Sequence, residues 1–320
     1  MKYKYPVDQC DVEDCLMLVA YRAARSKWIN WLEEDEHHSV WSQITGMMWQ
    51  DAVYRSINEA RGYSSQKAPT AASNGYVASF IDTGYVATQV LGIGRLVDSR
   101  KDVISLRRLV DDIRASKHLI TREIYVCYDG CPYDYEEVQR QYYEALSPED
   151  LSSVRGLPTD GPGAFGFSRR LHKAFDRLSK KTSEERRRDD TIAEVTFTDI
   201  AAALDHPVFQ KLKNLRHKFI AHAADEQSRS KAGLESVGTT LAELETAQRI
   251  LVEIAEMISS SVLYGAHHGQ VVPIPQFGHL KGLDKPFVPS TSIAALSKWW
   301  DMHMSDRGSW TDKPIYLNRD

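Results

Sequence analysis

One short stretch of the chain gathers an arginine and two histidines, in the order Asn214-Leu215-Arg216-His217-Lys218-Phe219-Ile220-Ala221-His222. A guanidinium can hold a phosphate through two parallel hydrogen bonds and keeps its charge at any physiological pH. An imidazole titrates near neutrality, so it can take up and release protons. RNA carries its own nucleophile in the 2′-hydroxyl, so cleavage needs only phosphate binding, charge neutralisation and proton transfer. Arg216, His222 and His217 are therefore a candidate catalytic set that requires no metal.

A helix over about residues 207–224 is expected to carry these side chains. Its apolar positions are spaced by four, three and four residues, which buries one face of a helix: Val208, Leu212, Leu215 and Phe219. At about 100° per residue, Arg216 and His222 lie roughly 120° apart around such a helix. A structural role also fits, because His222 continues the apolar stripe and Arg216 has acids nearby, at Asp205 and Asp225.

Basic residues are concentrated in a second region, residues 168–188, where nine Lys or Arg stand against three acids. A segregated basic patch on a chain whose net charge is −4 suits phosphate binding at one surface rather than wholesale coating of nucleic acid. A solvated helix face is the more common origin of such a charge run. The candidate nucleic-acid contacts are Arg169, Arg170 and Lys173 here, and Lys213 and Lys218 beside the motif.

The segment LRHKFIAH, residues 215–222, resembles the signature of the HEPN superfamily: an arginine, a polar residue directly after it, and a histidine four to six residues after the arginine. It is most similar to the abortive-infection (Abi) branch. Residues 95–98 followed by 104–109 are similar to an upstream pattern of that branch, and the resemblance extends over about residues 10–265.

This resemblance implies a metal-independent endoribonuclease that leaves a 2′,3′-cyclic phosphate and acts as a toxin or anti-phage effector. Arg216 would bind the phosphate, His222 would be the general acid or base, and His217 would assist. The resemblance also implies a homodimer that joins two motif helices in one cleft, RNA as the substrate, and an antitoxin or defence-system protein as a further partner. No cofactor or metal is expected.

Two alternatives belong to other classes of protein. Many HEPN proteins are thought to be non-catalytic, so the same helices would then form a module that binds a partner protein or nucleic acid. A zinc-stabilised scaffold would need Cys10, Cys15, Cys127 and Cys131, whose spacings are wider than those of usual zinc pairs. The G-x-G-x-x-G string at residues 161–166 has no strand-like segment before it, which argues against a dinucleotide site.

The expected fold is all-α: a HEPN-like helical bundle with a long N-terminal helical part over 12–32 and 39–60 and a final helix over 240–263. A helix over 76–91 is expected to be interrupted by Gly84 and ended by Gly92 and Gly94. Asp102 is expected to cap a helix over 103–116, and Ile120 to Tyr128 is the best strand candidate.

The domain prediction places a helical domain at residues 1–268, with a candidate insertion at 121–195, and a proline-interrupted C-terminal extension at 269–320. No apolar run approaches the roughly 20 residues that span a bilayer. Four cysteines are ordinary for a cytosolic protein. We therefore expect a cytoplasmic protein without a membrane segment.

Overall fold

The computed structural model describes residues 2–64, 74–146, 156–221, 226–231, 238–265, 267–269, 271–272, 274, 278, 280–281, 285 and 289–311. Helix accounts for 71% of the structure, which confirms the all-α prediction. Within the described ranges no strand forms, and the backbone makes a single isolated β-bridge between Thr121 and Thr191. None of the described helices is long and apolar enough to cross a membrane.

The chain divides into two compact units. The larger unit comprises Met1–Asp51 and Gly84–Pro273, and the smaller unit comprises Ala52–Thr83 and Ile274–Asp320. The smaller unit holds the end of helix α2 (Val40–Ser64), the start of α3 (Gly75–Leu96), and α13 (Ile293–Gly308), whose side chains are nearly all exposed. The predicted boundary between residues 268 and 269 stays a prediction.

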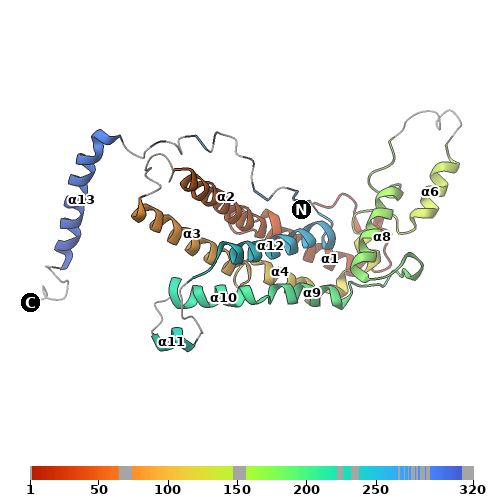
Figure 1. Cartoon of the computed structure of the whole chain (residues 1–320). Coiled ribbons are helices and arrows are strands. Elements are labelled where there is room, and N and C mark those ends of the chain that lie inside the picture. Colours follow the sequence, from red (N-terminus) through yellow and green to blue (C-terminus); the bar gives the residue numbers. More distant parts are fainter. Residues whose placement is uncertain are drawn as a thin grey trace, which may run out of the picture. The chain divides into compact units, whose positions relative to one another are not determined.

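The long helices of the larger unit form the bundle that carries the motif. They are α1 (Cys15–Ile29), the first part of α2, the second part of α3, α4 (Leu106–Ala115), α9 (Glu194–Leu204), α10 (Pro207–Leu215) and α12 (Leu241–Met257). Helices α9 and α10 follow one another along α12, which both of them contact (Figure 1). Each helix buries an apolar stripe in a shared core; examples at 2% exposure or less are Leu18, Trp28, Ile93, Leu109, Phe197, Leu212 and Leu251.

Shorter helices cover one end of α12. They are α5 (Arg122–Cys127), α6 (Tyr135–Glu144) and α8 (Phe165–Ser179), and α8 contacts α5, α6 and the turn Ile258–Val262 that follows α12. Arg122 is fully buried at this end and bonds to Asp176 at 2.7 Å, Asp190 at 3.0 Å and Ser179 at 3.1 Å. These bonds tie α5 to α8 and to the loop after it.

Three hydrogen bonds fix the helices that surround the motif. In the core, Gln248 of α12 donates to Gln89 of α3 at 2.9 Å, and Gln89 donates to the carbonyl of Met47 in α2 at 3.1 Å. At the surface, Lys211 of α10 bonds to Glu243 at 2.6 Å. Glu243 also completes the capping box with Thr240 at the start of α12. These bonds fix the positions of α3 and α10 relative to α12.

The predicted break in α3 is wrong, because the helix runs without interruption through Gly84, Gly92 and Gly94 to Leu96. A glycine inside a helix costs about 1 kcal/mol relative to alanine, which tertiary packing outweighs here. Gly62 likewise lies inside α2. The predicted cap at Asp102 is also wrong: Ser105 accepts the amide of Arg108 at 3.1 Å and starts α4.

The strand candidate over Ile120 to Tyr128 is helical instead. Thr121 caps α5 by accepting the amide of Ile124 at 3.2 Å. All six residues of α5 are buried, so this segment has no polar face and its sequence resembles a buried strand. Between the two helices predicted over 207–224 and 240–263 lies the short helix α11 (Glu226–Lys231).

Candidate RNA-cleavage site

The motif begins where α10 stops being a regular α-helix. Helix α10 ends at Leu215, and Arg216 to Ile220 form a π-helical turn in which the amide of Ala221 donates to the carbonyl of Arg216 at 2.8 Å. The predicted α-helix over 207–224 is therefore too long, and the assumed 100° per residue does not hold after Leu215. π-helical turns are frequent at functional sites. His222, the predicted acid–base residue, lies outside the described residues.

Arg216 is half-buried, and its guanidinium has two defined neighbours. On one side it lies against the backbone of α3 at Gly94: a Cβ at that glycine would overlap Nη1 and stand only 2.9 Å from Cδ and 3.1 Å from Cζ. On the other, Nη2 lies 3.0 Å from Nε2 of His217. Because a guanidinium can only donate, Nε2 must accept, which assigns a neutral His217 with its proton on Nδ1.

A cavity of about 100 Å³ opens beside the Arg216 side chain. Its lining comes from the last turn of α3, the segment after it and one face of α10, and includes Asp98, Ser99, Lys213 and Arg216. A larger, more open cavity of about 570 Å³ adjoins it, since both are lined by Val97, Ser99, Phe209 and Lys213. Lys213 stands where the two cavities meet.

The acids around these cavities are mostly neutralised by other cations. Asp98 pairs with Arg100 at 3.1 Å, and Asp205 pairs with Arg107 at 2.5 Å. Asp205 is therefore not the partner of Arg216. His206 caps α10 by accepting the amide of Val208 at 3.2 Å. Among the described residues, neither Lys213 nor Arg216 has a carboxylate within ion-pair distance, so both cations remain available to an anion.

Lys218 has a different environment from Lys213. Its Nζ donates to Ser228 in α11 at 2.6 Å, so it connects the π-helical turn to that short helix. Lys213 is exposed on α10. Of the two lysines predicted beside the motif, the structure thus brings Lys213 next to Arg216, whereas Lys218 is engaged with α11.

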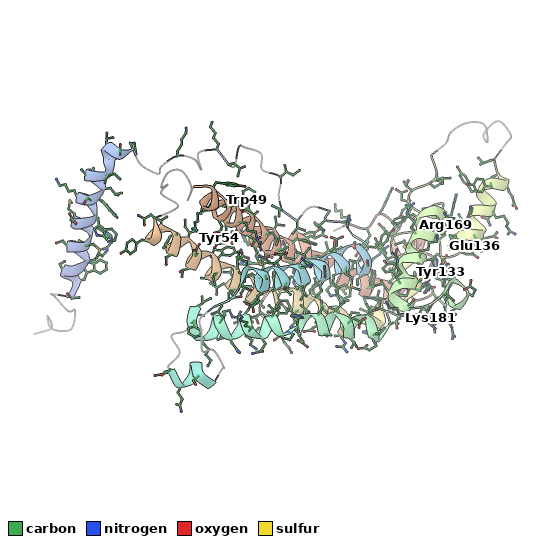
Figure 2. The ribbon with its side chains drawn as sticks, viewed as in Figure 1. Trp49, Tyr54, Tyr133, Glu136, Arg169 and Lys181 are labelled. Carbon is green, nitrogen blue, oxygen red and sulfur yellow. The ribbon has the colours of Figure 1, made fainter. Side chains whose placement is uncertain are left out.

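The basic stretch of residues 168–188 contains two kinds of cation. Arg186 and Arg188 are structural: Arg186 pairs with Asp176 at 2.7 Å, and Arg188 pairs with Glu123. In contrast, one face of α8, opposite its buried side, presents exposed cations without an ion pair in the described structure; we call these the α8 stripe: Arg169, Arg170, Lys173 and Arg177. Figure 2 labels Arg169 on α8.

The structure does not bring the α8 stripe to Arg216. Helix α8 packs on residues 258–262, whereas α10 is tied to Glu243 at the other end of α12. With a rise of 1.5 Å per residue, these two positions on α12 are about 25 Å apart. The predicted contacts Arg169, Arg170 and Lys173 therefore form a surface separate from the Arg216 cavity.

No group of three or more His, Cys, Asp or Glu side chains that could hold a metal ion occurs among the described residues. Cys127 and Cys131 are buried, and burial raises the pKa of the Cys131 thiol to about 12. Cys15 is exposed, and the Sγ of Cys10 lies 3.2 Å from Nη2 of Arg22.

Sequence reasoning missed Gly94 as a part of this site. Its signal was present, because an isolated glycine in a helical pattern marks either a break or a close approach of another group. The predicted helix end at Gly94 is wrong, and the side chain of Arg216 approaches the backbone there instead.

The model of the HEPN_AbiU2 family, described as AbiU2, matches residues 25–272, which is well over half of the chain and includes Arg216, Gly94 and both cavities. No curated protein and no solved structure matches the chain.

Proposed function

This chain belongs to the HEPN_AbiU2 family, and on that premise we propose that it is a metal-independent endoribonuclease of an abortive-infection system. One observation carries the proposal: Arg216 is a cation without a carboxylate partner among the described residues, and it lines a cavity beside Lys213. A phosphodiester is the natural occupant of such a place, since a guanidinium binds two phosphate oxygens and an ammonium adds charge.

The proposed reaction is an internal transfer. The 2′-hydroxyl oxygen attacks the phosphorus, the bond from phosphorus to the 5′-oxygen breaks, and the products are a 2′,3′-cyclic phosphate and a free 5′-hydroxyl. Arg216 offsets the charge on the non-bridging oxygens, and neutral His217 orients the guanidinium by accepting from Nη2. His222 moves a proton.

The proton count favours a dimer. One proton leaves the 2′-hydroxyl and another must reach the departing 5′-oxygen, and a single imidazole cannot serve as base and acid at once. Two copies of His222, one from each chain, meet this need in a shared cleft. We propose that the α8 stripe binds more distant parts of the same RNA, since its exposed cations suit phosphate contact without base recognition.

The direct test is RNA cleavage by the purified full-length protein. Arg216→Ala and His222→Ala should each abolish cleavage, with a loss of roughly 10² to 10⁴ in rate for His222→Ala. EDTA should not inhibit. Arg249→Ala is the matched control, because it removes an exposed arginine whose only ion pair in the described structure is with Glu245 on the same helix.

The outcome that removes the nuclease is equally definite. If the wild-type protein binds RNA but cleaves none of a broad set of cellular and phage RNAs, the chain is a non-catalytic binding module. Sedimentation that gives only monomer at micromolar concentration would remove the two-chain site.

A further inference from the structure

We propose that Gly94 is a positioning residue for Arg216, and this inference rests on the proposed role of Arg216 in binding phosphate. Because glycine has no side chain, α3 leaves a space at position 94, which we call the Gly94 seat. The guanidinium of Arg216 lies in this space, which keeps it beside the cavity that Lys213 also lines. No other residue type leaves this space.

The geometry indicates that position 94 is glycine to make room for Arg216 and not because the backbone conformation requires glycine. Gly94 lies within α3 and does not adopt a positive φ angle. Glycine is the least favourable helix residue after proline, so the helix itself gains nothing from it. The three atoms nearest to an added Cβ are Nη1, Cδ and Cζ, and all belong to Arg216.

The backbone is held on both sides of this contact, so the Arg216 side chain is the part that can move. Five residues before Gly94, the buried amide of Gln89 bonds to both α2 and α12 and holds α3 in place. The backbone of Arg216 is held by its carbonyl, which accepts the amide of Ala221. A methyl group at position 94 must therefore displace the guanidinium, which then loses its bond to His217, its place at the cavity, or both.

The test compares alanine substitutions at three glycines of the same helix. Gly94→Ala should lower kcat for RNA cleavage at least tenfold. Gly92→Ala is the matched control, because its Cβ would meet only Met47, at an ordinary 3.6 Å, and Gly84→Ala would meet nothing within 4 Å. Both controls should stay within twofold of wild type. Equal activity in all three variants would overturn the proposal.

A double-mutant cycle, measured by Tm, distinguishes a positioning role of Gly94 from simple misfolding of the variant. In wild type, Gly94→Ala should leave Tm nearly unchanged, because better helix propensity opposes the displaced arginine. In an Arg216→Ala background the seat is empty, so Gly94→Ala should raise Tm by about 2–4 °C. The same change in Tm in both backgrounds would show that residues 94 and 216 do not interact, and would refute the proposal.

This cycle also distinguishes the two proposals. If the wild-type protein cleaves no RNA while the Tm increments differ as expected, the nuclease fails and the Gly94 seat stands. If cleavage depends on Arg216 and His222 but Gly94→Ala is as active as Gly92→Ala, the nuclease stands and the seat fails.

Discussion

The side-chain amide of Gln248 in α12 donates a hydrogen bond to the side-chain oxygen Oε1 of Gln89 in α3, at 2.9 Å and with both side chains buried. This bond joins the helix that carries Gly94 to the helix against which α10 packs. Because a buried amide oxygen without a donor pays a desolvation penalty, the pair is a sensitive point in the bundle.

Gln248→Leu should therefore destabilise the protein by about 1–3 kcal/mol, since Gln89 would keep a buried oxygen without its donor. The double variant Gln89→Leu/Gln248→Leu should recover part of this loss, because it leaves no unpaired amide in the pair. Urea unfolding of the four proteins measures both effects. Additive losses in the double variant would contradict the bond.

His172 should make stability depend on pH. It is 2% exposed, and burial lowers its pKa to about 4, although its bond to the Tyr133 carbonyl acts in the opposite direction. The unfolded chain takes up a proton near pH 6.5, whereas the folded protein resists it until about pH 4. The free energy of unfolding is therefore unaffected by His172 above pH 6.5. It falls as the pH drops below that value and stops falling near pH 4.

The expected loss is about 3 kcal/mol over that interval. His172→Gln keeps a hydrogen-bonding group but cannot titrate, so its unfolding free energy should fall less than that of wild type between pH 6.5 and 4. Denaturant unfolding at several pH values gives the difference. Parallel curves for the two proteins would mean that His172 is not the titrating group.

The α8 stripe should affect long substrates only. The points at which α8 and α10 contact α12 and the turn after it are about 25 Å apart along its axis, roughly three Debye lengths at physiological salt, so we expect the charges of the stripe to have little direct effect on the Arg216 cavity. Arg169→Ala/Arg170→Ala/Lys173→Ala should raise KM for a long RNA and leave a dinucleotide substrate unaffected. For single-stranded RNA, the slope of log binding constant against log salt concentration should be smaller in this variant by about 0.7 per lost phosphate contact. An equal effect on both substrates would argue against a separate RNA surface.

Helices with a clear apolar face and a local cap could be predicted from the sequence. Leu241–Met257 is an example, since its buried residues follow helical spacing and Thr240 caps its start. Helix α5 could not be predicted in this way, because a fully buried segment has no polar face to reveal its period. Continuity of α3 through Gly84 and Gly92 depends on packing against other helices, which local propensity does not contain.

The site was predictable only in part, for a related reason. The types and order of Arg216 and His217 are written in ten consecutive residues. The contact with Gly94 joins positions more than a hundred residues apart, and the pairing of Asp205 with Arg107 instead of Arg216 depends on how α4 meets α9. Sequence spacing gives no access to either.

The π-helical turn after Leu215 changes how spacing in this motif should be counted. A turn closed by an i to i+5 bond holds about one residue more than an α-helical turn, so the chain reaches Ala221 one residue out of phase with a regular helix. In an alignment, such a turn is equivalent to a one-residue insertion. It rotates the residues that follow around the helix axis without adding a turn. Counting from Arg216 as though the helix were regular therefore misplaces Ala221 around the helix axis by about one residue.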